Sequence, residues 1–221
     1  LNIDETKIEE AINENTVAIM AVHTMGRMSQ MDVISDIASR HGLIVIEDAC
    51  EAHGAKFKDK FVGHWGHMSV YSFYLETSIG LEAIGVFWDT FWTRHAFMKT
   101  MRESCRGYED VAWFSEEDEG NINCPHGFSI TCKKEGDIEI VKEALDKYNI
   151  HHKRNFGSIP TQHLAFRDMG YILGDFPEAE WIGNNGVHIG CHQYLSDDDI
   201  KRICAAMVEA LDECRTSAKE E

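Results

Sequence analysis

The sequence predicts an α/β fold in two parts, and three observations carry this prediction. A strand, a helix and a second strand follow one another with short connections between residues 16 and 48, which is the pattern of a parallel βαβ unit. The second strand reads Leu-Ile-Val-Ile before Glu47 and Asp48, which predicts burial on both of its faces. Beyond residue 127, strand and helix patterns indicate a small α+β domain.

The first part should contain the sheet domain, over residues 1–110. Hydrophobic periodicity and turn signals predict its first elements in order: a helix over 5–13 capped by Asp4, a strand over 16–23, a helix over 31–41 that stops at Gly42, and a strand over 43–47. Because the carboxyl ends of parallel strands meet at one edge, we expect His23 and Asp48 to lie at that edge.

Further strands are expected over 68–74 and 85–89, followed by a helix over 90–104. Between the strands over 43–47 and 68–74, the alternation of lysines with Phe57 and Phe61 predicts an exposed hairpin with both phenylalanines in the core.

An acidic, turn-rich stretch over 111–126 reads as a linker, and the second domain should span 127–221. Its expected elements are a strand over 128–134, a helix from a cap at Asp137 to about residue 148, strands within 149–155 and 186–192, and a long final helix. Ser196 and Asp199 form a capping box at the start of that last helix.

Composition narrows the possible functions. The 221 residues are 43% hydrophobic, which is enough for a proper core. With 21 basic against 38 acidic residues, the formal charge is −17, so we expect no nucleic acid and no anionic membrane surface as partners. No apolar run approaches the ~18 residues that span a bilayer.

Cysteine and histidine usage predicts a cytoplasmic protein without a metal site. The seven cysteines lack CxxC spacing, and several lie in apolar segments as small hydrophobic residues. None of the candidate ligands forms two matched zinc-binding pairs. These candidates are His53, His64 and His67, the pair His151 and His152, and Cys191 with His192.

Several segments together resemble one known family. "AVHTMGRMSQMD", "HGLIVIEDACEAHGAKFKDKFVGHWG", "VYSFY" and "GDFPEAEWIGNNGVHIGCHQYLSDDDI" occur in the order seen in the DegT/DnrJ/StrS-type sugar aminotransferases. These are pyridoxal phosphate (PLP) enzymes of fold type I, the aspartate aminotransferase fold. The resemblance therefore implies a PLP-transferase-like sheet domain, with a segment before Leu1 and an internal segment near residues 115–126 missing relative to the family.

The resemblance also implies roles for three residues. Asp48 matches the aspartate that holds the protonated pyridine nitrogen, Glu51 lies near the ring oxygen, and Ser72 helps hold the phosphate. Other interpretations stay open at this point. Asp48 alone could cap a helix or belong to a buried ion pair, and Glu51 and Ser72 could satisfy loop backbone groups.

The chain departs from the family at the Schiff-base lysine. That lysine lies five residues after the serine, a position that Thr77 occupies here, and a hydroxyl cannot link to the cofactor aldehyde. The dehydratase relatives carry a histidine at this point, so Thr77 matches neither version. The three lysines 56, 58 and 60 are better explained by the exposed hairpin than as a substitute. His192 is a candidate on the substrate side.

The family function is amino transfer from an amino donor to a keto group of a nucleotide-linked sugar. For this chain we expect that chemistry to be impaired or absent. The alternative is a non-catalytic homologue that keeps the fold as a binding or assembly subunit. A sheet domain without its family N-terminal segments should expose apolar surface, so we also expect a homo-oligomer.

Overall fold

A computed structural model describes residues 2–72, 84–123, 126–155, 161, 168–192 and 194–217, without the side chains of 84–91. The chain divides into two compact units, and each is described by itself. Unit 1 consists of Leu1–Ala96 with Glu117–His126, and unit 2 of Phe97–Glu116 with Gly127–Glu221. The expected domain boundaries, with a linker over 111–126, stay a prediction.

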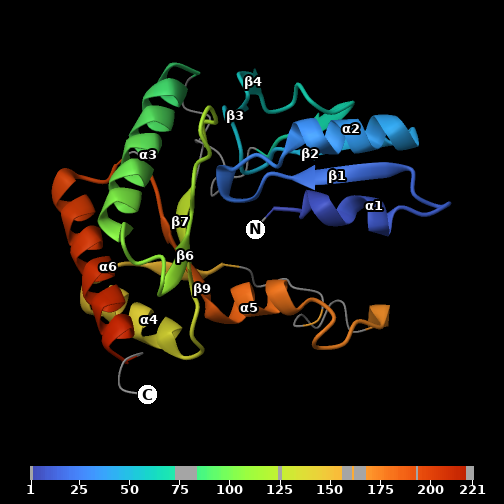
Figure 1. Cartoon of the computed structure of the whole chain (residues 1–221). Helices are drawn as coiled ribbons and strands as arrows, with labels where there is room; N and C mark the ends of the chain where they lie inside the picture. The colour runs from blue at the N-terminus through green and yellow to red at the C-terminus, as the bar shows by residue number, and fades with distance from the viewer. Residues whose placement is uncertain are drawn as a thin grey trace. The chain divides into compact units, whose positions relative to one another are not determined.

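Unit 1 is built around three parallel strands in the order β1-β2-β5. β1 pairs with β2 and β2 with β5, all in parallel, so the predicted βαβ unit is confirmed. Its elements are η1 (Glu5–Lys7), α1 (Ile8–Ala11), β1 (Ala18–Val22), η2 (Thr24–Gly26), α2 (Met31–His41), β2 (Ile44–Asp48), β3 (Lys56–Phe57), β4 (Lys60–Phe61), β5 (Met68–Val70) and the first part of α3 (Ile84–Cys105) (Figure 1).

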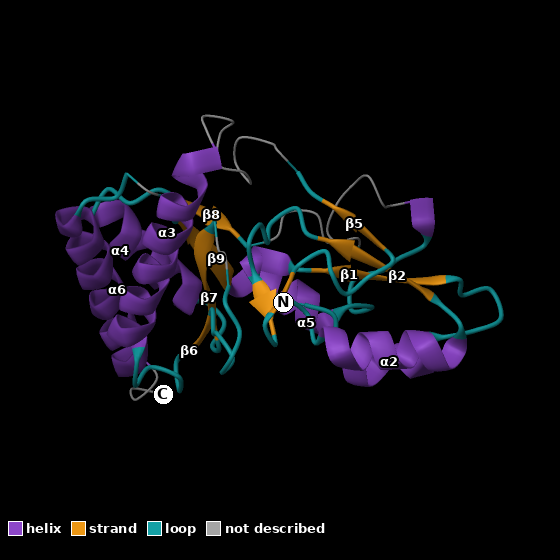
Figure 2. Cartoon of the chain, turned by 90° about the horizontal axis from the view of Figure 1, so that it is seen from above, coloured by secondary structure: helices purple, strands orange, loops and turns teal. Residues whose placement is uncertain are grey.

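Helix α2 forms as its sequence predicts. Met31, Ile34, Ile37 and Ala38 recur at helical spacing, and all four are buried. The helix stops at Gly42, whose φ of +66° lies in the left-handed region that favours glycine. Figure 2 shows α2 running along one side of the β1-β2-β5 sheet. One face of this sheet is therefore packed against α2.

The opposite face of the same sheet is apolar and exposed. Met20, Ile46 and Met68 are in register across the three strands, with exposed fractions of 52% for Met20 and 56% for Met68. Ile44, at the start of β2, is 44% exposed. The prediction that this strand is buried on both faces is therefore wrong for the described residues, because only the side chains facing α2 are covered.

Unit 2 has a four-stranded antiparallel sheet in the order β6-β7-β9-β8. Its helices and strands are the rest of α3, β6 (Ala112–Phe114), β7 (Gly127–Cys132), α4 (Asp137–Lys147), β8 (His152–Arg154), α5 (Pro177–Asn185), β9 (Gly186–Gly190) and α6 (Asp197–Ser217). Side chains from α3, α4, α6, β7 and β9 share one hydrophobic core, with Leu145, Met207 and Leu211 fully buried in it.

The capping box of the last helix is confirmed. Ser196 Oγ accepts the backbone N–H of Asp199 at 3.2 Å, and Asp199 Oδ2 accepts the backbone N–H of Ser196 at 3.0 Å. These reciprocal bonds satisfy two groups that would otherwise lack partners where α6 begins.

Several expected elements differ from the structure. Residues 85–89 belong to helix α3 and not to a strand, because a short apolar run does not distinguish the two and this run continues into a helical pattern. Asp137 is the first residue of α4, and the N-cap position expected for it belongs to Gly136, at φ +92°. Only Phe57 of the hairpin pair is buried, while Phe61 is 37% exposed. Strand β6 falls within the stretch expected to be a linker, and α5 was not expected.

Candidate functional site

Asp48 lies at the carboxyl end of β2, the central strand of the unit 1 sheet. Val22 and Val70, the last residues of β1 and β5, are in register with it on either side. Its Oδ1 accepts the backbone N–H of Cys50 at 3.1 Å, which is an Asx-type turn within the loop. The side chain of Cys50 also interacts with this carboxylate. The carboxylate of Asp48 is half-buried at the strand end, and its described partners both belong to Cys50.

Glu51 is directed back toward the end of β1. Its Oε2 accepts the backbone N–H of Met25 at 2.6 Å. Met25 has a φ of +56°, which is uncommon for a residue with a side chain, so this charge-assisted bond helps to hold a strained turn. Glu51 therefore satisfies a backbone N–H group of the turn after β1, which accords with the interpretation that it serves the loop backbone.

Ser72 lies two residues beyond β5. Cys50 lies near Ser72 and also near the carboxylates of Asp48 and Glu51. The Cys50 Sγ is 3.9 Å from the carbonyl oxygen of Val70, and the backbone of Ser72 also contacts the thiol. Burial raises the pKa of the Cys50 thiol to about 11, and the carboxylates of Asp48 and Glu51 add to this rise. The structure thus gathers Asp48, Glu51 and Ser72 around a thiol that stays protonated at neutral pH.

Glu47, next to Asp48, points to the opposite side of the sheet and is fully buried. It accepts four hydrogen bonds, from the backbone N–H groups of Gly63, Trp65 and Gly66 at 2.6–2.9 Å and from His23 Nε2 at 3.2 Å. Burial acts to raise the pKa of Glu47, but these hydrogen bonds outweigh it and hold the pKa below its ordinary value. Glu47 therefore fastens the 63–66 loop as an ionised carboxylate.

The tautomer of His23 follows from its neighbours. His23 is fully buried, and its Nδ1 accepts the backbone N–H of Ser29 at 3.2 Å. An acceptor carries no proton, so the hydrogen of the neutral ring is on Nε2 and is donated to Glu47. His23 thus joins the turn after β1 to the 63–66 loop. The sequence placed His23 at the strand end but did not indicate this network.

His192, the candidate on the substrate side, lies in unit 2 just after β9. Its Nδ1 accepts the backbone N–H of Tyr194 at 3.2 Å, and its side chain is exposed. Thr77, at the expected lysine position, lies outside the described residues.

The three hairpin lysines interact with neighbouring groups in unit 1. Lys58 pairs with Asp32, while the ammonium groups of Lys56 and Lys60 lie 4.4 Å and 4.2 Å from the ring centres of Phe61 and Trp65. These contacts agree with an exposed hairpin.

The described ranges hold neither a cluster of metal ligands nor a membrane-spanning helix. Those ranges contain no group of three or more His, Cys, Asp or Glu side chains placed to hold a metal ion. None of the helices in the same ranges is both long and apolar enough to cross a bilayer.

Several curated proteins are similar to this chain over only part of their own length. The chain is 48% identical over 84 residues to a "Pleiotropic regulatory protein" of Geobacillus stearothermophilus, covering 38% of this chain and 23% of that protein. It is 36% identical over 78 residues to the "dTDP-3-amino-3,4,6-trideoxy-alpha-D-glucose transaminase" of Streptomyces venezuelae, covering 35% and 21%. The matched stretches thus span about a quarter or less of these relatives.

Similarity of fold extends over nearly the whole chain. The PLP-form of the "putative sugar aminotransferase Spr1654" from Streptococcus pneumoniae matches with a TM-score of 0.82 and 13% identity, covering 96% of this chain and 73% of that one. This likeness confirms the fold type I prediction. The model of the DegT/DnrJ/EryC1/StrS aminotransferase family matches residues 1–87 and 75–208. The chain therefore belongs to the DegT/DnrJ/EryC1/StrS aminotransferase family.

Proposed function

We propose that this chain keeps the pyridine-recognition edge of a PLP-dependent nucleotide-sugar aminotransferase, while its own amino transfer is impaired. The reaction of that class moves an amino group from an amino donor to a keto group of a nucleotide-linked sugar. The observation that carries the proposal is the half-buried Asp48 carboxylate at the carboxyl end of the central strand, whose described partners both belong to the neighbouring Cys50.

The residues of this edge fit the polar groups of PLP. A carboxylate at Asp48 suits a protonated ring nitrogen, because the two carry opposite charges, and its place between the ends of β1 and β5 leaves it on the uncovered face of the sheet. Ser72 would contact the phosphate and Glu51 the ring oxygen. When bound, PLP supplies an electron sink for the bonds of an attached amine.

The impairment follows from the residue at the lysine position. Thr77 offers a hydroxyl where amino transfer needs a primary amine. Cys50, the nucleophile nearest to Asp48 in the sequence, does not replace that amine, because its pKa of about 11 keeps it protonated at neutral pH. Asp48 is therefore expected to recognise PLP without a covalent bond to the chain.

Titration with PLP, followed by absorbance, tests the role of Asp48. We expect saturable binding by the wild type and about tenfold weaker binding by Asp48→Asn, which keeps the shape but loses the charge. Asp59→Asn, on the exposed hairpin turn, is the matched control and should bind like the wild type. Equal affinity of Asp48→Asn and wild type, with a lowered melting temperature for the variant, would favour a purely structural Asp48.

Borohydride reduction of the PLP mixture tests the missing amine. The wild type should give no pyridoxyl-lysine by mass spectrometry, and Thr77→Lys is the variant that supplies the amine. A pyridoxyl adduct on a lysine of the unmodified chain, together with turnover of an amino donor, would overturn the proposed impairment.

We also propose that the chain assembles into a homo-oligomer in the cytoplasm. The exposed apolar face around Met20, Ile44 and Met68 is the observation that favours assembly, and it also supports a non-catalytic assembly subunit as the second candidate function. The cysteines in the described part of the chain are free thiols, as expected in a reducing compartment. Light scattering at micromolar concentration tests assembly, and a mass near the 25.1 kDa of one chain would contradict it.

A further inference from the structure

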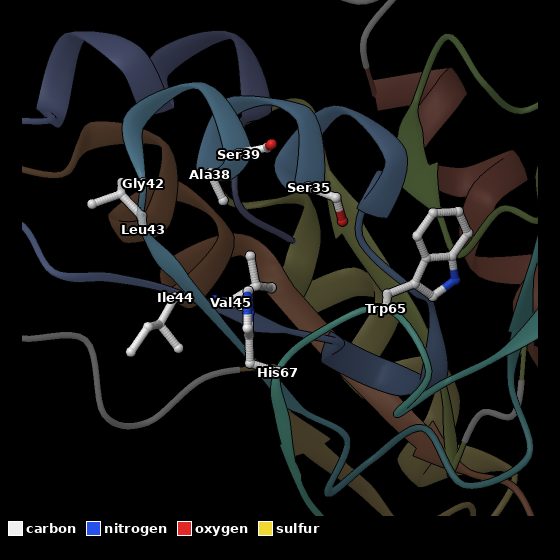
Figure 3. Close-up of a pocket in the computed structure, with 9 residues that line it drawn as sticks. All are labelled: Ser35, Ala38, Ser39, Gly42, Leu43, Ile44, Val45, Trp65 and His67. Atoms are coloured by element: carbon white, nitrogen blue, oxygen red, sulfur yellow. Dashed lines mark hydrogen bonds between the residues drawn. The ribbon is translucent and has the colours of Figure 1, made fainter.

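Unit 1 contains a second concave site that the proposed function does not use. A pocket of about 410 Å³ lies between α2, the turn at Gly42, the start of β2 and the segment 65–67 (Figure 3). Such a volume is within the range of small-molecule sites. Its lining residue Ile44 and Asp48 are at opposite ends of β2, about 13 Å apart at ~3.3 Å per residue. The pocket is therefore separate from the Asp48 edge.

One buried hydroxyl in this pocket has an unused hydrogen-bonding capacity. Within the described residues, Ser35 Oγ is buried and has no hydrogen-bond partner. Figure 3 shows this hydroxyl directed from α2 toward the space bordered by Val45, Trp65 and His67. A buried polar group without a partner is costly, so a ligand group that bonds to Ser35 would recover free energy on binding.

A second polar group is the imidazole of His67. Its Nδ1 accepts the backbone N–H of Val45 at 3.0 Å, so the hydrogen of the neutral ring is on Nε2. The side chain of His67 is exposed at the pocket rim and can donate this hydrogen to an oxygen. Ser35 and His67 thus offer a hydroxyl and an N–H donor to the same space.

The remaining lining is apolar or uncharged. Ala38 and Val45 are buried in the floor, and the indole ring of Trp65 forms one end. The described lining includes no Asp, Glu, Lys or Arg, although the chain as a whole carries a formal charge of −17. A phosphate or carboxylate would find no cationic partner here, so the lining favours an uncharged ligand.

We propose that this pocket binds a small neutral compound with several hydroxyl groups, of the size of a cyclic polyol or a monosaccharide. Its hydroxyls bond to Ser35 Oγ and to His67 Nε2, and its C–H face lies against the ring of Trp65. Neither contact involves Asp48 or PLP, so this site stands independently of the proposed aminotransferase ancestry.

Saturation-transfer NMR on the full chain tests the site with methyl β-D-glucoside and myo-inositol as probes. We expect saturable binding at millimolar concentration, and about tenfold weaker binding by Ser35→Ala. His67→Asn should show the same loss, because the amide oxygen can still accept from Val45 while the Nε2 donor is gone. Ser104→Ala, in which the hydroxyl of an exposed α3 serine is removed, is the matched control and should bind like the wild type.

Thermal melting separates binding from folding. Ser35→Ala should melt at or above the wild-type temperature, because it removes a hydroxyl without a partner and introduces a better helix former. The proposal is overturned if neither probe binds saturably, if cyclohexanol or inorganic phosphate binds as well as the two polyols, or if both pocket variants bind like the wild type. If Ser35→Ala does not fold, the His67→Asn result decides alone.

Discussion

Strands β7 and β2 are both central in their sheets, yet they are covered differently. All six residues of β7 are buried: Phe128, Ile130 and Cys132 face the helices, and Ser129 and Thr131 are buried on the other face. In β2, only Val45 and Glu47 are buried, and Ile44 is 44% exposed. Within the described residues, unit 2 therefore closes its own core, while unit 1 leaves one sheet face open.

The two units also differ in the charge of the buried polar groups that form hydrogen bonds beside these strands. In unit 2, Asn155 Nδ2 donates to the carbonyl of Ile130 and to the Thr131 hydroxyl, so the buried polar groups beside β7 are joined by neutral hydrogen bonds. In unit 1, a buried charge at Glu47 holds the loops on the covered face. We infer that stability in unit 2 depends mainly on packing, and that unit 1 depends to a larger degree on one carboxylate.

The largest expected effect is on the packed core of unit 2. Leu211→Ala removes a fully buried side chain from α6, and we expect a loss of about 2–5 kcal/mol in the free energy of unfolding, because a cavity remains. Denaturant unfolding followed by circular dichroism measures it. The control Leu173→Ala, at a side chain that is 72% exposed, should cost less than about 0.5 kcal/mol. Equal losses of unfolding free energy for the two variants would contradict the inference that packing in this core stabilises unit 2.

A loss of about 2–4 kcal/mol is expected for Glu47→Gln. The amide turns a donor toward backbone N–H groups that need an acceptor, which leaves buried donors unpaired. The same unfolding assay at pH 7 measures this loss. Glu10→Gln, at a side chain that is 72% exposed, is the matched control.

The contribution of Glu47 should also depend on pH. Because hydrogen bonds hold its folded pKa below the ordinary value, the carboxylate stabilises the fold fully above the unfolded pKa of about 4.3. That contribution is lost as the pH falls through the folded pKa. The difference in stability between wild type and Glu47→Gln should therefore shrink below about pH 4. A constant difference from pH 7 to pH 3 would show that the charge of Glu47 does not stabilise the fold.

A smaller effect is expected at the start of α6. Ser196→Ala removes the hydroxyl that accepts the Asp199 N–H, and it should cost about 1 kcal/mol of unfolding free energy. Circular dichroism melting curves against Ser104→Ala measure this loss. A Ser196 variant that melts like the wild type would mean that the capping box contributes nothing measurable.

The smallest effect on stability is expected on the open face of the unit 1 sheet. Met20 is 52% exposed, so Met20→Thr should change the unfolding free energy of one chain by less than about 0.5 kcal/mol. The same change should lower the oligomer mass measured by light scattering if this face is the contact between copies. A large loss of stability with an unchanged mass would show that Met20 is covered within the chain.

The sequence by itself determined the local elements and the place of Asp48. Helix α2 and its stop at Gly42, the parallel βαβ unit and the capping box at Ser196 depend on periodicity and on neighbours within a few residues. Asp48 was predictable for the same reason, because a strand followed by an acid places that acid at the carboxyl edge of a parallel sheet.

Only the tertiary structure decided what surrounds that edge. Glu47 receives its hydrogen bonds from His23, which is 24 residues earlier, and from residues 16 to 19 positions later, and no local pattern indicates such partners. The exposure of one face of the unit 1 sheet could not be predicted from the sequence either, because an apolar run has the same pattern whether or not a neighbouring element covers it. Local periodicity fixes which way a side chain points, while burial and ionisation depend on residues that are distant in the sequence.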